Sequence, residues 1–427
     1  PDKATTVSYT VKGLKAGTAG YRFRIRAYKT YGSTKQYGSW SKELKVNTNP
    51  YGVGGFKIKS KSSTSITLQW NKGTTASGYQ LQQYKNGKWV TISAPDKATT
   101  VSYTVKGLKA GTAGYRFRIR AYKTYGSTKQ YGSWSKELKV NTNPYGVGGF
   151  KVKSKSSTSI TLQWNKGTTA SGYQLQQYKN GKWVTISAPN KATTVSYTVK
   201  GLKAGTAGYR FRIRAYKTYG STKQYGSWSK ELKVNTNPYG VGGFKVKSKS
   251  STSITLQWNK GTTASGYQLQ QYKNGKWVTI SAPNKATTVS YTVKGLKAGT
   301  AGYRFRIRAY KTYGSTKQYG SWSKELKVNT NPYGVGGFKV KSKSSTSITL
   351  QWNKGTTASG YQLQQYKNGK WVTISAPNKA TTVSYTVKGL KAGTAGYRFR
   401  IRAYKTYGST KQYGSWSKEL KVNTNPY

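Results

Sequence analysis

The sequence contains no cysteine, no histidine and no methionine, and it has only seven acidic residues among 427. Without cysteine, the chain can form neither a disulfide nor a thiolate metal site, which leaves both the cytosol and export open as compartments. Without histidine or cysteine, and with no second carboxylate in the later units, the chain has no partner to share acid, base or nucleophile roles with a carboxylate such as Glu137. No apolar run approaches the roughly 20 residues of a membrane span. These absences argue against an enzyme, a metal or cofactor site and a membrane segment.

What the sequence does contain is a repeat. A Pro-Tyr pair recurs every 94 residues, and this period divides the chain into four full units and one partial unit. The units cover residues 51–144, 145–238, 239–332 and 333–427, while residues 1–50 are the C-terminal part of a further unit. We therefore expect the chain to be a window from a longer array.

Each unit carries a large excess of basic residues. Residues 51–144 contain thirteen lysines and three arginines against Asp96 and Glu137, and the later units have Asn190, Asn284 and Asn378 in place of Asp96. The whole chain has a formal net charge of +67. Because the excess is spread over every unit, it predicts attraction to polyanions that weakens with added salt.

A strictly alternating segment is the strongest secondary-structure signal. Tyr115, Phe117, Ile119 and Ala121 alternate with Arg116, Arg118 and Arg120. This period of two predicts a strand with one face in a core and the arginines on the other face. The segment occurs five times along the chain.

The rest of a unit is also typical of strands. We expect them at residues 56–59, 63–70, 79–84, 88–93, 99–105 and 138–140, in addition to the arginine-bearing strand. Asn86-Gly87 is typical of a two-residue hairpin turn, and residues 123–130 are expected to form a hairpin loop. No segment has helical periodicity. The prediction is an all-β tandem array of seven-stranded sandwiches.

The parity of Trp134 conflicts with this pattern, because it matches Leu138 and Val140 and would place the indole in the core. We expect a bulge within residues 132–136 to turn Trp134 outward.

The pattern of whole units resembles the fibronectin type III domain. The resemblance is carried by Trp70, Tyr79, residues 107–112 leading into Tyr115, and Asn141-Thr142. It implies a Greek-key sandwich with three strands in one sheet and four in the other, and a tyrosine corner in which Leu108 packs beneath Tyr115. Near-identical tandem units of this kind also resemble the repeat regions of large surface proteins of Gram-positive bacteria.

A second resemblance concerns residues 131–135, Tyr-Gly-Ser-Trp-Ser. They are similar to the Trp-Ser-x-Trp-Ser box of cytokine-receptor modules, in which aromatic rings interleave with arginines of the neighbouring strand. Tyr131 and Gly132 replace the first Trp-Ser pair, so the sequence does not assure a complete ladder at that end.

The arginines admit two interpretations. Neighbouring guanidinium groups on alternate strand positions repel by roughly 0.6 kcal/mol per pair, and stacking on Trp134 or Tyr131 returns about 0.5–1 kcal/mol per contact. The arginines are therefore either a structural ladder, with Gln80 and Gln82 accepting hydrogen bonds, or an anion site. As an anion site, they predict that Arg118→Gln lowers polyanion affinity more than Lys72→Gln.

Further candidate residues surround the ladder. Lys57, Lys59 and Lys61 are expected on the outer side of an edge strand, where lysine also prevents strand-to-strand aggregation. Lys136 and Lys139 extend the basic surface. Four aromatic residues are expected to be exposed and able to stack on sugars: Trp89, Tyr122, Tyr125 and Tyr131. We expect one or two of these to cover a sandwich end or a joint between units instead. Glu137 is expected to pair with Lys123 or Lys139.

These observations predict a non-catalytic stalk or fibre of an extracellular or cell-surface bacterial protein. Its partners are expected to be anionic polymers such as teichoic acid, acidic polysaccharide or mucin, and nucleic acid only non-specifically. Two alternatives remain open, namely a self-assembling filament or sheath built from copies of the chain, and a carbohydrate-binding accessory array.

Overall fold

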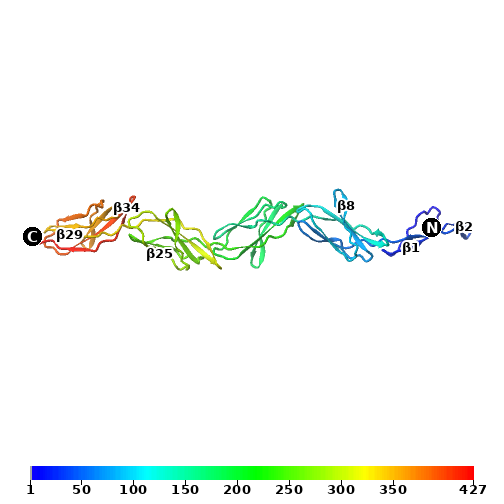
Figure 1. Ribbon diagram of the computed structural model, residues 1–427, viewed down its shortest axis with the longest axis horizontal. Helices are drawn as coiled ribbons and strands as arrows, with labels where there is room; N and C mark the ends of the chain where they lie inside the picture. Colours follow the sequence, from blue (N-terminus) through cyan, green and yellow to red (C-terminus); the bar gives the residue numbers. More distant parts are fainter. Residues whose placement is uncertain (1) are drawn as a thin grey trace. The chain divides into compact units, whose positions relative to one another are not determined.

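The computed structural model describes residues 2–427, and every regular element in that range is a β-strand (Figure 1). The all-β prediction is confirmed. The chain divides into two compact units, one with residues up to 152, 162–197 and 209–233, the other with 153–161, 198–208 and 234 onward. Repeats 51–144, 239–332 and 333–427 each lie within one unit. In the described range, no helix long and apolar enough to cross a bilayer is found.

Repeat 51–144 contains eight strands: β5 (Lys57–Lys61), β6 (Ile66–Gln69), β7 (Gly78–Lys85), β8 (Lys88–Ser93), β9 (Ser102–Val105), β10 (Tyr115–Tyr125), β11 (Thr128–Tyr131) and β12 (Leu138–Val140). One sheet has the order β5-β6-β9. The other has the order β11-β10-β7-β8, with β12 pairing the first part of β10. All the pairings within these two sheets are antiparallel.

The same eight strands recur in each later repeat. Repeat 145–238 has β13 (Lys151–Lys155), β14 (Ile160–Gln163), β15 (Gly172–Lys179), β16 (Lys182–Ser187), β17 (Ser196–Val199), β18 (Tyr209–Tyr219), β19 (Thr222–Tyr225) and β20 (Leu232–Val234). Repeat 239–332 has β21 (Lys245–Lys249), β22 (Ile254–Gln257), β23 (Gly266–Lys273), β24 (Lys276–Ser281), β25 (Ser290–Val293), β26 (Tyr303–Tyr313), β27 (Thr316–Tyr319) and β28 (Leu326–Val328). Repeat 333–427 has β29 (Lys339–Lys343), β30 (Ser347–Gln351), β31 (Gly360–Lys367), β32 (Lys370–Ser375), β33 (Ser384–Lys388), β34 (Tyr397–Tyr407), β35 (Thr410–Tyr413) and β36 (Leu420–Val422).

The core of repeat 51–144 is formed by the inward-facing residues of both sheets. Its buried members are Ile66, Leu68, Trp70, Tyr79, Leu81, Val105, Leu108, Phe117, Ile119, Ala121 and Val140. Trp70 and Tyr79 meet edge to face, with ring centroids 5.4 Å apart. Repeats 239–332 and 333–427 have equivalent cores. Each of these cores is apolar and closed by two sheets, as expected for a sandwich that folds without disulfides.

Two local devices fix the connections. Asn86 and Gly87 both have positive φ, 50° and 79°, and they join Lys85 to its pairing partner Lys88 in a two-residue hairpin, as predicted. The Tyr115 hydroxyl accepts a hydrogen bond of 2.9 Å from the backbone N–H of Lys109. This bond is the corner implied by the resemblance, and it fixes the chain just before β10.

The structure has one more strand per repeat than predicted. Residues 123–130, expected to be a loop, belong mostly to the end of β10 and to β11, which pair from Tyr122 with Tyr131 to Tyr125 with Thr128. The sandwich therefore has three and five strands. Only Gly126 and Ser127 form the turn, because β10 continues for 11 residues.

The first edge strand contains a bulge that corrects one prediction. The β5–β6 register runs from Lys57–Gln69 and Ile58–Leu68 to Ser60–Thr67 and Lys61–Ile66, so Lys59 is an additional residue. Lys57 and Lys59 are exposed, as predicted. Lys61, predicted to lie on the outer side, instead pairs with buried Ile66, and burial lowers the pKa of its ammonium group.

Residues 2–50 contain counterparts of β10, β11 and β12 only, namely β1 (Tyr21–Phe23), β2 (Tyr28–Tyr31), β3 (Thr34–Tyr37) and β4 (Leu44–Val46). They form two small sheets, β1-β4 and β2-β3. Because residues 2–50 lack counterparts of β5 to β9, Ile25 is exposed at a position where the equivalent Ile119 is buried.

Candidate functional site

The outward face of β10 carries the arginines, as predicted. In the register of β10 with β7, Arg118 lies opposite Gln82 and Arg120 lies opposite Gln80. Arg116 lies opposite Lys139 of β12. Their alternation with buried Phe117 and Ile119 follows from the strand period of two.

Aromatic rings separate the three guanidinium groups. The stack, called the arginine ladder below, consists of Tyr84, Arg116, Trp89, Arg118, Trp134, Arg120 and Tyr131. Arg118 lies 4.4 Å from the ring of Trp89 and 4.1 Å from that of Trp134. Arg120 lies 4.3 Å from Trp134 and 3.9 Å from Tyr131. The ladder is therefore complete at the end where Tyr131 replaces tryptophan.

In the ladder, the ring contacts together are stronger than the repulsion between guanidinium groups. Arg116 contributes two further ring contacts, at 4.2 Å to Tyr84 and 5.6 Å to Trp89, which makes six in all. At about 0.5 kcal/mol each, six contacts outweigh two guanidinium repulsions of about 0.6 kcal/mol. The arrangement is therefore stabilising in itself.

The glutamines orient the guanidinium groups, also as predicted. Arg118 donates to Gln82 Oε1 from Nε at 2.9 Å and from Nη2 at 2.7 Å. Arg120 donates from Nε to Gln80 Oε1 at 2.7 Å. Both glutamines donate their amide hydrogens to Thr91 Oγ1, at 3.0 and 3.3 Å. These acceptors are neutral, so Arg118 and Arg120 keep their positive charge unpaired within the ladder.

Arg116 differs, because it is neutralised by Glu137. Its Nε and Nη2 donate to Oε1 and Oε2 of Glu137, both at 2.6 Å, in a two-pronged ion pair. Lys139 lies farther away, 3.9 Å from Oε1. The predicted pairing of Glu137 with Lys139 is therefore present as the longer of two ion pairs, whereas the closer partner, Arg116, was not predicted. The bond to Arg116 holds the pKa of Glu137 below its ordinary value and raises the pKa of Arg116.

Trp134 faces outward because of the expected irregularity. The N–H of Gly132 donates to the Ala121 carbonyl, and the N–H of Ser135 donates to the Ile119 carbonyl. Three steps along this segment therefore match two steps along β10, which amounts to one inserted residue. This insertion places the indole between Arg118 and Arg120.

The expected exposed aromatics are mostly covered. Tyr122 is only 1% exposed, because its ring contacts Tyr131 at 5.9 Å and Lys129 lies over it at 4.2 Å. The opposite residue is Gly78, where a Cβ would lie 2.6 Å from the Tyr122 hydroxyl. Tyr122 thus lies on the ladder face, as its parity predicts, but it cannot stack on a ligand.

Trp89 and Tyr131 are half-buried as ladder members, so most of their ring surface is also occupied. Tyr84 was missed. Its position on β7, two residues after Gln82, is the signal that could have placed it beside Arg116.

Tyr125 covers a joint, one of the outcomes expected for these aromatics. Its hydroxyl donates to the carbonyl of Thr48 at 2.8 Å, two residues before Pro50. Gly132 lies against the same connecting segment, since a Cβ there would be 2.7 Å from the Pro50 carbonyl oxygen. This close approach explains why glycine stands where the cytokine-receptor box has serine.

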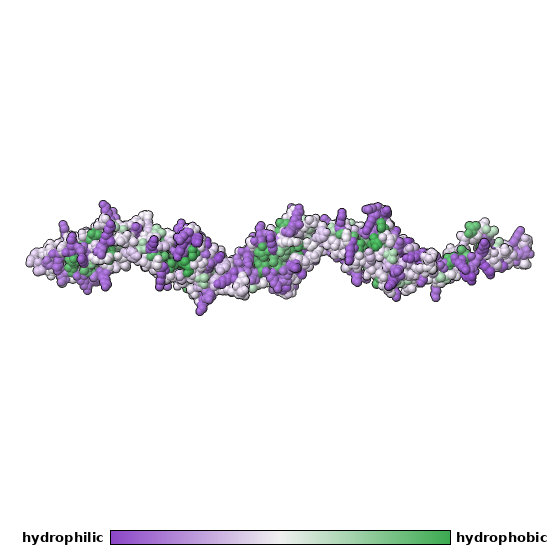
Figure 2. Space-filling view, in the orientation of Figure 1, coloured by the Kyte–Doolittle hydropathy of each residue, from purple (hydrophilic) through white to green (hydrophobic). Residues whose placement is uncertain are grey.

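Lysine is the most accessible charged group. In repeat 51–144 the exposed lysines are Lys57, Lys59, Lys72, Lys85, Lys88, Lys97, Lys106, Lys109, Lys129, Lys136 and Lys139. Figure 2 shows hydrophilic side chains protruding from the surface, with smaller hydrophobic patches between them. The lysines predicted as binding residues thus reach solvent, with the exception of half-buried Lys61.

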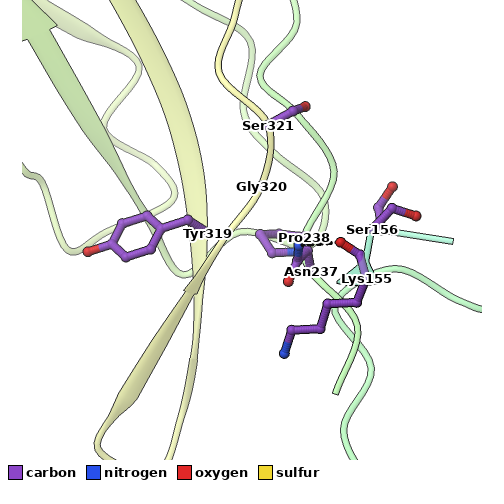
Figure 3. A pocket seen from close by; sticks show the side chains of 8 residues that line it. Lys155, Ser156, Asn237, Pro238, Tyr319, Gly320 and Ser321 are labelled. Atoms are coloured by element: carbon purple, nitrogen blue, oxygen red, sulfur yellow. Dashed lines mark hydrogen bonds between the residues drawn. The ribbon is translucent and has the colours of Figure 1, made fainter. Parts of the chain in front are cut away.

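A small cavity of about 260 Å³ lies within the second unit, beside the connecting segment (Figure 3). It is lined by Lys155, Ser156, Ser157, Asn237, Pro238, Tyr319, Gly320 and Ser321. The Tyr319 ring points away from Pro238, because it stacks on Arg308 at 3.8 Å. Lys155 is then the only charged lining residue, which makes this cavity a weak candidate for binding.

Comparison with known proteins assigns the repeats. The sequence profile of the Fibronectin type III domain matches residues 51–138, 145–232, 239–326 and 333–420. Exoglucanase B of Cellulomonas fimi is 28% identical over 326 residues, which cover 73% of this chain and 28% of that protein. Receptor-type tyrosine-protein phosphatase S of Gallus gallus is 25% identical over 329 residues, covering 73% of this chain and 21% of the relative. The chain thus spans less than a third of the length of either relative.

Among solved structures, the FN1-FN3 domains of chicken CNTN1 share 16% identity, with 66% of this chain and 99% of that one covered and a TM-score of 0.27. That likeness is too low to support an argument. The profile matches cover most of the sequence, and the matched repeats 51–144, 239–332 and 333–427 each have the two sheets and the closed core of a sandwich. The chain therefore belongs to the fibronectin type III family, with four tandem domains.

Proposed function

We propose that this chain is a non-catalytic repeat region of an extracellular or cell-surface protein, and that it binds anionic polymers through lysines displayed by every repeat. The main support for this proposal is the excess of exposed positive charge over negative charge. Repeat 51–144 exposes eleven of its thirteen lysines and contains two acids, one of which is held by Arg116. Such a surface attracts polyanions from any direction.

The exposed lysines are the preferred contacts. Lys136 and Lys139 flank Glu137 beside the ladder, while Lys57 and Lys59 are exposed on edge strand β5 of the other, three-stranded sheet. Arg118 and Arg120 add charge to the ladder face, but their Nε donors are already bonded to glutamine. The ladder therefore adds positive potential to its own face, while the lysines offer the most accessible donors.

The acidic residues of the repeats are not arranged for catalysis. Glu137 is occupied by a two-pronged bond with Arg116, which lowers its pKa and removes it as a proton donor near neutral pH. Asp96 is replaced by asparagine in the three later repeats. No paired carboxylates are therefore common to the repeats, as general acid–base chemistry would require.

The experiment compares two lysines of one strand. In the first three full repeats, Lys59, Lys153 and Lys247 are exposed, while Lys61, Lys155 and Lys249 are half-buried. Substituting either set with glutamine removes the same charge. We expect the Lys59 set to weaken binding to polygalacturonate or teichoic acid more than the Lys61 set, as measured by calorimetry at several salt concentrations. Failure of the unmodified chain to bind either polymer would contradict the proposal.

The likeness to an exoglucanase supports a second candidate, a carbohydrate-binding accessory region. It predicts retention on neutral polysaccharide at high salt, where binding through lysine is screened. Sedimentation with insoluble cellulose in 1 M salt separates the two functions, because an electrostatic binder stays in solution.

A further inference from the structure

Each sheet of repeat 51–144 ends in strands that have one unpaired side. Such a side offers main-chain N–H and C=O groups to any other extended chain, and edge lysines or bulges prevent that pairing. Strand β5 has three lysines and a bulge at Lys59. Strand β8 begins with Lys88 and has a register shift against β7. Strands β11 and β12 are short and contain Lys129 and Lys139.

Strand β9 is the exception among the edge strands described in this repeat. It comes last in the order β5-β6-β9, its sequence Ser-Tyr-Thr-Val contains no lysine, and it pairs with β6 without a register shift. The equivalent strands β17, β25 and β33 begin with the same four residues. Each repeat therefore has one sheet edge that neither lysine nor a bulge protects.

The register of β9 shows which of its main-chain groups are free. The Trp70 N–H donates to the Val101 carbonyl at 2.9 Å, so these two residues form a hydrogen-bonded pair. Because such pairs alternate along an antiparallel ladder, the main-chain groups of Ser102 and Thr104 point away from β6. The hydroxyl oxygens of Thr67 and Thr104 are 3.0 Å apart, as expected for the closer, non-hydrogen-bonded pairs. Ser102 and Thr104 are both exposed.

The surroundings of this edge favour one kind of partner. On the inward-facing side of the edge, Val101 is 37% exposed and Tyr103 is half-buried against the core. Lys97 precedes the strand and Lys106 follows it, and both are exposed. Because side chains alternate along a strand, an added strand can place apolar residues beside Val101 and Tyr103 and acidic residues on its other face.

We propose that β9 and its equivalents bind an extended segment of another protein as an additional strand of the three-stranded sheet, and that this segment alternates apolar with acidic residues. The main chain of Ser102 and Thr104 supplies two donors and two acceptors. A second copy of this chain is a poorer occupant, because each repeat brings the same excess of positive charge. The inference goes beyond the proposed function, in which charge alone attracts a polymer, because here main-chain hydrogen bonds hold the partner.

The test uses the full chain and two synthetic peptides of equal charge. The first alternates valine and glutamate over eight residues. The second has the same sequence with methylated main-chain nitrogens, which keeps the charge and removes the donors. Calorimetry at fixed ionic strength is expected to show about tenfold weaker binding of the methylated peptide, the effect of losing one or two hydrogen bonds.

A pair of variants tests the strand itself. Thr104, Thr198, Thr292 and Thr386 are replaced by proline in one variant and by valine in the other. Both variants lose the hydroxyl, but only proline removes the outward N–H, and proline is tolerated on an edge strand where that N–H faces solvent. We expect about fivefold weaker binding of the unmethylated peptide to the proline variant and binding within about twofold for the valine variant. Binding of polygalacturonate should be unchanged in both.

Because the proline variant could fold poorly, hydrogen exchange is also measured on the unmodified protein. The amide hydrogens of Ser102, Thr104 and their equivalents are expected to exchange about tenfold more slowly with the unmethylated peptide. Those of Lys57 and Lys59 on β5 are expected to keep their rates. Unchanged exchange at Ser102 and Thr104 overturns the inference.

The remaining outcomes separate this inference from the proposed function. Equal binding of the two peptides overturns added-strand pairing, while attraction of polyanions stands. Failure of the chain to bind polygalacturonate overturns the proposed function and leaves the difference between the peptides as the measure of strand pairing. If exchange at Ser102 and Thr104 slows with protein concentration and no peptide, the edge pairs with a second copy and the proposed partner is wrong.

Discussion

At the scale of single residues, the acid that recurs in every repeat has a defined partner. Glu137 is the one acid that every repeat retains, and its side chain is 26% exposed beside Arg116. The pair neutralises the end of the ladder that has no glutamine opposite. Glutamine serves the other two arginines because Gln80 and Gln82 lie directly across from them on β7. Local register therefore decides which arginine is neutralised.

The Arg116–Glu137 pair predicts a pH dependence. The folded-state pKa of Glu137 lies below its ordinary value of 4.5, as do those of Glu231, Glu325 and Glu419. Their contribution to stability is therefore present above pH 4.5 and is lost as the pH falls through the lowered pKa. Replacing all four by glutamine should lower the thermal midpoint at pH 7, and the gap to the unmodified protein should close in acid. A gap that stays constant from pH 7 to pH 2 would show that the pairs do not contribute in this way.

Gly78 gives a second prediction at this scale. A Cβ there would lie 2.2 Å from the Pro95 carbonyl and 2.6 Å from the Tyr122 hydroxyl. Gly78→Ala should destabilise the repeat by about 1–3 kcal/mol, as overpacking in a closed site does. Gly54→Ala is the matched control, because its added Cβ meets nothing closer than 3.7 Å. Chemical denaturation measures both, and similar losses would mean that Tyr122 and the Pro95 carbonyl can both move aside.

At the scale of elements, β10 combines both roles of the repeat. Its inward residues close the core and its outward residues carry the ladder. The simple alternation is broken three times in the repeat, by the inserted residue near Trp134, by the register shift between β7 and β8 at Leu81 and Gln82, and by the bulge at Lys59 in the other sheet. The first and the last of these breaks each turn a side chain, that of Trp134 or Lys61, to the face opposite that predicted by uninterrupted alternation. The exposed basic surface is thus set by irregularities as much as by strands.

The ladder changes what we expect of Arg118. Since Arg118 stacks on two rings and bonds Gln82, Arg118→Gln should lower the stability of its repeat by about 1–2 kcal/mol. Because two of its five N–H donors are bonded to Gln82 and two rings stack on its guanidinium group, its loss should weaken polyanion binding about as much as Lys72→Gln, one charge in each case. Denaturation and calorimetry on the two variants check both statements. A much larger affinity loss for Arg118→Gln would favour the ladder as a direct anion site.

At the scale of the whole molecule, the formal charge of +67 is distributed over near-identical repeats. A long polymer can therefore engage several repeats at once, whereas a short oligomer engages one. The proposed function therefore predicts a much higher affinity for a long polymer than for a short oligomer, because linked sites multiply their contributions.

Substituting Lys59, Lys153, Lys247 and Lys341 by glutamine, one repeat at a time, tests this multiplication. The logarithm of the affinity for long polygalacturonate should fall in nearly equal steps with each repeat altered. For tetragalacturonic acid, the unaltered repeats should keep their affinity, so that only the affinity of the altered repeats falls. The same pattern for long and short ligands would contradict binding by several repeats together.

Much of the fold could be predicted from residues alone. The alternation from Tyr115 to Ala121 fixed the strand and its buried face, and Asn86-Gly87 fixed a hairpin, because both follow from local backbone geometry. The glutamine partners of Arg118 and Arg120 were predictable only with the family resemblance, because its Greek-key order places β7 beside β10 and the period of two then turns both sets of polar side chains to one face. The 94-residue period settled the number of units.

The tertiary structure alone decided what covers each outward residue. Tyr122 and Trp89 have outward positions, yet neighbouring strands and loops cover their rings. Lys61 turns inward because of a bulge that the residue types in β5 do not predict. Burial of an outward side chain depends on contacts between segments far apart in sequence, such as Tyr122 with Gly78. Periodicity within one strand carries no information on such contacts, so the sequence determined the faces and the packed sheets determined which groups on them remain free to bind.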